Sequence, residues 1–202
     1  MWFLGWLNKS DPAQDSDETL MLRFQQGQSQ ALETLYERYS RRLRGYVASL
    51  GGARPDDLVQ DTFAKVIQKA SSFRGDSSFK TWLFVIARNT ARDAARRAKI
   101  RRTASLDQPL DADSGYALID QVATSSPHHD PERSAHDATM AAALKVALAA
   151  LPEDQREVFA LRQFSGLSFK EVAAAVGCNE NTAKSRMRYA LESLRSALQE
   201  FR

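Results

Sequence analysis

SGLSFKEVAAAVGCNENTAKSRMRYALESLRSALQ, residues 165–199, is the stretch that decides the fold of this 202-residue chain. Ser168 and Glu171 form the S-x-x-E pattern of a capping box, which predicts the start of a short helix. Gly177 and Asn179 predict that this helix ends in a tight turn. The next helix is predicted over residues 180–199. Two helices joined by a short glycine-containing turn form a helix-turn-helix.

The predicted last helix has an apolar face and an opposite polar face. The polar face carries four side chains near the helix start: Asn181, Lys184, Ser185 and Arg188. Arginine and lysine donate to guanine edges and phosphates, and asparagine pairs with adenine. The pattern therefore predicts a DNA-contacting helix, and the alternative is an ordinary helical hairpin with a solvated face. Arg186, beside this face, is expected to bind a phosphate or an acid such as Glu157.

Residues 138–202 form one helical domain in this prediction, and an acidic segment precedes it. Residues 103–137 contain seven acidic side chains and one basic one, together with several Pro, Ser and Gly. No helical or strand periodicity continues through them, so we predict an extended linker between two domains.

Residues 17–102 form the other predicted domain. Apolar residues recur at helical spacing between Leu32 and Leu50, and the GGARP run at residues 51–55 ends that helix. A second helix is predicted over residues 56–70, with Asp56 or Asp57 as its cap. Its early Asp57, Gln60 and Asp61 fit either favourable helix-dipole placement or an acidic protein-docking face.

The third helix of this domain is predicted over residues 79–99, after a polar loop at 71–78. Arg88, Arg92, Arg96 and Lys99 form a basic stripe along it, within a block of net charge +6 at residues 88–102. A basic stripe next to aromatic side chains suits a separated DNA strand, and the alternative is a solvated helix face. We expect Trp82 in the core, whereas Asn89 on the same face is either structural or base-contacting.

Several classes of protein are excluded by composition. The single cysteine, Cys178, allows no internal disulfide, and no metal-ligand spacing, phosphate loop or nucleophile motif is present. We therefore expect no enzymatic activity, no cofactor and no small-molecule substrate. No apolar run reaches the length of a membrane span, and the apolar Met1–Leu7 stretch lacks the basic region and the longer apolar run of a signal peptide. The expected location is therefore the cytoplasm.

The motifs resemble one family, the extracytoplasmic-function (ECF) sigma factors. The run DLVQDTF at 57–63 and the run FRGDSSFKTWLFVIARN at 73–89 look like sigma region 2. LPEDQREVF at 151–159, GLSFKEVA at 166–173 and TAKSR at 182–186 look like region 4. The resemblance covers about residues 17–100 and 138–200.

The resemblance implies that the chain binds core RNA polymerase and directs it to promoters. Asp57, Gln60 and Asp61 would dock on the polymerase. Phe73, Ile86 and Asn89 would form a pocket for a flipped minus-ten base, and Arg88, Arg92 and Arg96 would hold the melting DNA. The helix-turn-helix residues Asn181, Lys184, Ser185 and Arg188 would contact the minus-thirty-five element.

The family also implies an anti-sigma factor, under which regions 2 and 4 pack together. Two features depart from the family pattern. Lys184 stands where many members have arginine, so the base preference does not carry over, and the apolar Trp2–Leu7 segment is unusual.

The predicted fold is therefore all-α, with two small helical domains. Residues 1–16 are an unstructured extension, 17–102 are region 2, 103–137 are the linker and 138–202 are region 4. A conventional helix-turn-helix regulator that binds duplex DNA without polymerase is the alternative, but it leaves residues 73–89 unexplained.

Overall fold

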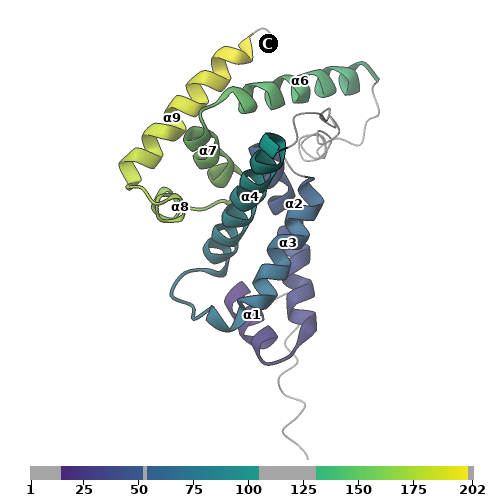
Figure 1. Cartoon of the computed structure of the whole chain (residues 1–202), viewed down its shortest axis with the longest axis vertical. Helices are drawn as coiled ribbons and strands as arrows, with labels where there is room; N and C mark the ends of the chain where they lie inside the picture. Colours follow the sequence, from purple (N-terminus) through teal and green to yellow (C-terminus); the bar gives the residue numbers. More distant parts are fainter. Residues whose placement is uncertain (1–14, 52–53, 105–130, 200–202) are drawn as a thin grey trace, which may run out of the picture.

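The computed structural model describes residues 15–51, 54–104 and 131–199, and every regular element in these ranges is helical. The prediction of an all-α fold is therefore confirmed. In chain order the elements are α1 (Asp17–Gln25), α2 (Ser29–Leu50), α3 (Pro55–Gln68), the 3-10 turn η1 (Ala70–Ser72), α4 (Phe79–Ala104), α6 (Pro131–Ala150), α7 (Glu153–Ser165), α8 (Phe169–Val176) and α9 (Glu180–Ala197). Figure 1 shows them as two groups, α1–α4 (the N-terminal bundle) and α6–α9 (the C-terminal bundle).

The ends of α4 and α6 differ from the sequence prediction. The basic helix α4 continues to Ala104, and α6 begins at Pro131, inside the stretch assigned to the linker. Proline suits the first turn of a helix because its missing N–H would have no partner there. The prediction of an unstructured extension over residues 1–16 is wrong at its end, because Asp15 pairs with Arg23 and Ser16 caps α1. The rest of that extension, residues 1–14, and the remaining linker, residues 105–130, lie outside the described residues.

The N-terminal bundle is built on α2. Its buried face contains Leu35, Tyr39, Leu43, Tyr46 and Val47. The sequence predicted four of these, but it placed Tyr36 on this face in place of Leu35, and Tyr36 is 43% exposed. The helix ends at Gly51, whose φ of 74° lies in the region that favours glycine.

The start of α3 corrects one prediction. Neither Asp56 nor Asp57 caps this helix; the capping position is occupied by Arg54, which makes no side-chain cap, and Pro55 opens the first turn. Asp56 instead pairs with Arg44 of α2.

The helix-turn-helix has the predicted form. The Ser168 Oγ accepts the backbone N–H of Glu171, and the Glu171 carboxylate accepts the Ser168 N–H at 2.8 Å, which completes the capping box. Gly177 ends α8 in the left-handed conformation with a φ of 76°. The Asn179 side chain then caps α9 by accepting the Thr182 N–H at 2.7 Å.

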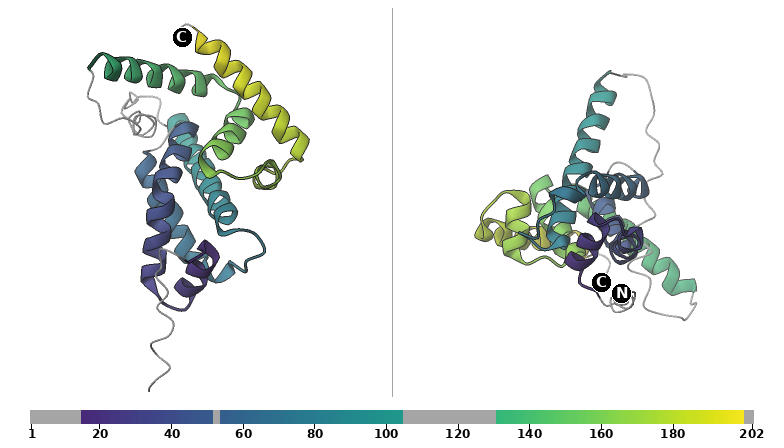
Figure 2. Two further views of the ribbon diagram at one scale, coloured as in Figure 1. Left: turned by 180° about the vertical axis from the view of Figure 1, so that it is seen from behind. Right: turned by 90° about the horizontal axis from the view of Figure 1, so that it is seen from below.

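The two bundles share one hydrophobic core. Val158 and Leu161 of α7 belong to the same buried cluster as Leu43 and Tyr46 of α2. Helix α7 packs along α2 and also contacts α4. In both views of Figure 2 the C-terminal bundle lies against the N-terminal bundle. A second, smaller cluster joins α6 to α9 through Leu148 and Leu194. The free chain therefore adopts a closed arrangement.

Glu171 bridges the bundles as well as capping α8. Its Oε1 accepts the Thr81 hydroxyl at 2.9 Å, and Thr81 lies in the first turn of α4. The Ser78 side chain caps the same turn by accepting the Thr81 N–H at 3.2 Å. The hydrogen bonds from Ser168, followed by the one from Thr81, lower the pKa of Glu171 to about 2.

Replacing Glu171 is predicted to destabilise the chain in a pH-dependent way. Because its pKa is lowered on folding, the carboxylate stabilises the fold above its ordinary pKa, near 4.5, and this contribution disappears as the pH falls toward 2. We expect Glu171→Gln to cost about 1 kcal/mol at pH 7 and less at pH 3 in urea unfolding. The control Glu192→Gln, at an exposed position of α9, should change stability by less than about 0.5 kcal/mol. An equal loss at both pH values for Glu171→Gln would contradict this role.

Candidate nucleic-acid interface

The predicted DNA-contacting face lies on the outside of α9. Asn181, Lys184, Ser185 and Arg188 are all exposed, while Ala183 and Ala190 on the opposite side are buried. Lys184 forms a 2.6 Å ion pair with Glu180, and the Arg188 guanidinium lies 4.9 Å from the centre of the Tyr189 ring. Both contacts are at the surface, so both cations remain available to a DNA backbone or base edge.

A cleft runs between this face and the start of α7. It has a volume of about 820 Å³, and its lining includes Asn181, Ser185 and Tyr189. Arg186 closes one side through a 2.9 Å ion pair with Asp154. The acid partner of Arg186 is therefore Asp154 and not Glu157, because Glu157 lies one turn further along α7 and faces the N-terminal bundle.

The basic stripe of α4 is divided by the closed arrangement. Arg92, Arg96 and Lys99 are exposed, but Arg88 is turned into the seam between the bundles. Its Nε lies 2.7 Å from Glu157 Oε1 and its Nη2 lies 3.1 Å from Glu157 Oε2. The side chains of Arg88 and Glu157 are only 13% and 12% exposed, so this bidentate pair is nearly shielded from water.

Of the three residues predicted to hold a flipped base, Phe73 lies in the loop before α4, and Ile86 and Asn89 lie in the first half of α4 beside Arg88. Phe73 and Ile86 are each 5% exposed, whereas Asn89 is exposed. The Phe73 ring meets the Trp82 ring at 5.3 Å between centroids, and Trp82 packs against the core. Phe73 thus packs on Trp82, which precedes Ile86 by one turn of α4 and Asn89 by two, and Phe73 and Ile86 are covered while Asn89 is open to solvent.

The acidic residues of α3 form a separate exposed surface. Asp57, Gln60 and Asp61 lie one turn apart and face away from the core. Ile67, two turns further on, is 51% exposed. An acidic surface with an apolar neighbour suits a protein partner better than nucleic acid, because phosphates repel carboxylates.

Tyr46 is a functional candidate that the sequence did not reveal. Its side chain is fully buried beneath the seam, and among the described residues its hydroxyl has no hydrogen-bond partner. Burial, with the nearby Glu157 charge adding to it, raises the pKa of Tyr46, so the hydroxyl stays protonated. The amphipathic pattern of α2 predicted the burial of Tyr46, but the seam above it is formed by residues more than 100 positions away.

Other site types are absent from the described part of the chain. Residues 15–51, 54–104 and 131–199 contain no group of three His, Cys, Asp or Glu side chains that could hold a metal ion. None of the helices in these ranges is long and apolar enough to cross a membrane.

The fold and its surfaces are those of a two-part helical protein with a helix-turn-helix and a separate exposed acidic surface. Comparison with known families gives the same result. Residues 35–101 match sigma-70 region 2, and residues 141–194 match sigma-70 region 4.

Curated relatives match nearly the whole chain. The sequence is 31% identical over 192 residues to the RNA polymerase sigma-H factor of Pseudomonas aeruginosa, covering 92% of this chain and 95% of that protein. It is 33% identical over 190 residues to the ECF RNA polymerase sigma-E factor of Escherichia coli K12, covering 91% and 95%.

Solved structures share the fold. CnrH in complex with the cytosolic domain of CnrY has a TM-score of 0.64 and 25% identity, covering 92% of this chain and 99% of that chain. The sigma factor RpoE in complex with the anti-sigma factor NepR, from Bartonella quintana, has a TM-score of 0.61 and 28% identity, covering 83% and 96%. The chain therefore belongs to the ECF sigma factors, the subunits that bind RNA polymerase and promoter DNA to start transcription. This family is not known for enzymes.

Tyr46→Phe is predicted to stabilise the free chain. The substitution removes a buried polar atom without a partner and keeps the ring, which packs edge-on against Phe84 at 5.5 Å. We expect a gain of about 1 kcal/mol in urea unfolding at pH 7. The exposed Tyr36 provides the matched control, and Tyr36→Phe should change stability by less than about 0.5 kcal/mol. A loss of stability in Tyr46→Phe would show that the hydroxyl is satisfied.

Proposed function

We propose that this sigma factor divides a promoter between its two bundles, with region 4 on the minus-thirty-five element and region 2 on the minus-ten element. The observation that carries the proposal is the exposed donor face of α9, which a helix-turn-helix presents to the major groove. Lys184 and Arg188 supply donors for guanine or phosphate, and Asn181 suits adenine.

The minus-ten element is assigned to the start of α4 and the loop before it. Asn89 would donate to the edge of an unstacked base, and Phe73 and Ile86 would form the apolar walls. Because both apolar side chains are covered in the free chain, Phe73 must move to admit a base. Arg92 and Arg96 would follow the phosphates of the separated strand, and Arg88 would join them when it is released.

The acidic surface of α3 is the proposed docking site for core polymerase. Asp57, Gln60 and Asp61 remain exposed in the closed arrangement, so this surface can dock before the bundles separate. The chain would then act with the polymerase in the cytoplasm and have no catalytic activity of its own.

Use of both promoter elements requires the closed arrangement to open. Two DNA sites about 25 base pairs apart are separated by about 85 Å along B-form DNA. The 26 residues between Ala104 and Pro131 reach about 90 Å when fully extended. The linker is thus long enough for the bundles to occupy both elements at once, whereas bundles that share a core are not far enough apart.

An anti-sigma factor is the proposed regulator. The structural relative RpoE was solved in complex with the anti-sigma factor NepR, and CnrH was solved in complex with the cytosolic domain of CnrY. A partner that holds α7 against α2 would keep Arg88 paired with Glu157 and away from DNA.

Run-off transcription tests the function. Bacterial core polymerase is given the region upstream of the protein's own gene, with and without the purified chain. We expect a discrete transcript only with the chain, and its start site locates both elements. Absence of a transcript together with absence of core binding on a sizing column would contradict the proposal and favour the duplex-binding regulator.

Substitutions in region 2 are predicted to separate promoter opening from polymerase binding. Asn89→Ala should slow open-complex formation about tenfold because it removes a base contact, and holoenzyme affinity should stay within about twofold. Asp61→Lys should do the reverse, weakening core binding first. Permanganate footprinting and a core-binding titration give the two readouts. Normal opening by the Asn89→Ala holoenzyme would contradict the base pocket.

In region 4, Arg188→Ala is predicted to weaken minus-thirty-five binding by about 1–3 kcal/mol if Arg188 contacts a base. The loss should concentrate at one base pair when each position of the element is varied in turn. The exposed Arg195, about four turns from the start of α9, supplies the control Arg195→Ala. A uniform loss across all sequences would assign Arg188 to phosphate instead.

A further inference from the structure

Helix α1 lies outside the matched region 2 segment, yet it touches both ends of the loop that carries Phe73. This loop joins η1 to α4 and spans residues 73–78. Residues 74–77 within it are exposed.

Gln25, the last residue of α1, holds the start of the loop. Its Nε2 donates to the carbonyl oxygen of Ala70 at 2.7 Å and to that of Phe73 at 2.9 Å. One amide group thus bonds the first residue of η1 and the residue that follows this turn. These two bonds hold the backbone at Ala70 and Phe73 and do not involve the Phe73 ring.

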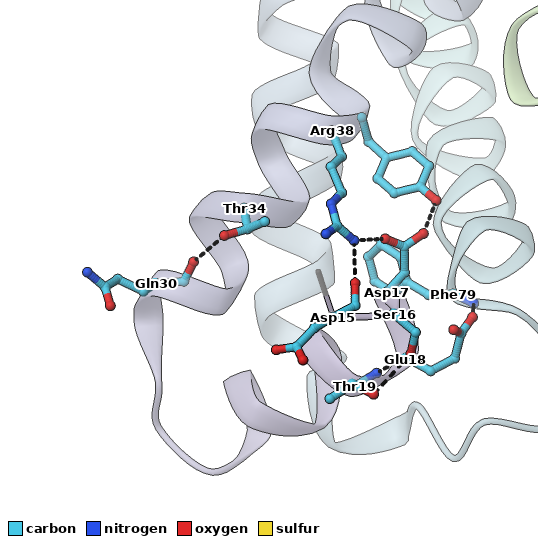
Figure 3. Close-up of polar contacts among 10 residues, drawn as sticks. Asp15, Ser16, Asp17, Glu18, Thr19, Gln30, Thr34, Arg38 and Phe79 are labelled. Carbon is cyan, nitrogen blue, oxygen red and sulfur yellow. Dashed lines mark hydrogen bonds and ion pairs between the residues drawn. The ribbon is translucent and has the colours of Figure 1, made fainter. Parts of the chain in front are cut away.

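Glu18, in the first turn of α1, holds the end of the loop. Its Oε1 accepts the backbone N–H of Phe79 at 2.9 Å, and Phe79 is the first residue of α4 (Figure 3). The first N–H groups of a helix have no partner within it, and a carboxylate there is favoured by the helix dipole. Glu18 therefore fixes the point at which α4 begins.

Helix α1 is itself anchored to α2. Ser16 caps it, and Asp17 bonds Arg38 at 2.7 Å as well as the Tyr39 hydroxyl (Figure 3). Leu20 and Met21 are fully buried on the side facing the core. The two side chains that hold the loop thus project from a rigid support.

We propose that α1 is a brace for promoter opening and that Gln25 and Glu18 are positioning residues for the loop that captures the minus-ten base. The inference rests on the proposed function of Phe73. It adds that the capture geometry depends on two side chains that hold the backbone at the two ends of the loop.

The test uses holoenzyme and a promoter mapped by run-off transcription. A fluorescent base analogue at the flipped minus-ten position reports capture, and a titration with core polymerase reports assembly. We expect Gln25→Ala to slow capture about tenfold because two hydrogen bonds are lost, and to leave core affinity within about twofold. Gln25→Glu, which has the same shape but no amide donors, should be at least as slow.

Glu18 offers a conservative comparison. Glu18→Gln keeps an oxygen that can accept the Phe79 N–H and should stay within about threefold of the unsubstituted rate, whereas Glu18→Ala should fall about tenfold. A general folding defect would lower core affinity together with capture. The exposed neighbour of Gln25 gives the control Gln26→Ala, which should behave as the unsubstituted chain.

The outcomes distinguish the brace from the base pocket. If Phe73→Ala slows base capture and Gln25→Ala does not, the proposed role of α1 is wrong, and the proposed base pocket is still supported. If Phe73→Ala captures the base normally, the pocket is wrong and the brace fails with it. A parallel loss of capture and core affinity in Gln25→Ala would also overturn the brace, because the residue would then be structural only.

Discussion

The ion pair between Arg88 and Glu157 is the contact around which the free chain is organised. It closes a seam formed by apolar residues of α2 and α7, and the pair is bidentate and nearly shielded from water. A buried pair contributes little net stability, but removal of one partner leaves an uncompensated charge and costs about 3–5 kcal/mol. The pair therefore selects one way of packing the bundles. Glu171 also joins the two bundles, at the start of α4. Its carboxylate accepts hydrogen bonds at the first turns of two helices from different bundles, α4 and α8.

The same contact connects the fold to promoter binding. Arg88 belongs to the basic stripe of α4, so under the proposed function the pair with Glu157 keeps one cation of that stripe from DNA while the chain is closed. Opening exposes apolar residues of α2 and α7, and contacts with the polymerase must offset that cost.

Local chemistry made much of this predictable. The capping box was found because Ser168 and Glu171 are three residues apart, and the exposed face of α9 follows from helical spacing. The tertiary partners could not be predicted from the sequence. Thr81 lies 90 positions from its partner Glu171. Arg88 has the same helical spacing as Arg92 and Arg96, and nothing in that spacing indicates that Arg88 contacts the other bundle. The sequence does not indicate a role for Gln25, because an exposed glutamine at a helix end is common. Its role follows only from the structure, in which the carbonyl oxygens of Ala70 and Phe73 lie beside it.

The distance between the bundles tests the account most directly. Dyes placed at Gln30→Cys on α2 and Ser193→Cys on α9, in a Cys178→Ser background, would report it by single-molecule energy transfer. The account predicts one short distance in the free chain, a higher fraction of long distances in Glu157→Gln, and a single long distance on the polymerase with promoter DNA. A free chain that already shows the long distance, or a distance that stays short on the promoter, would contradict it.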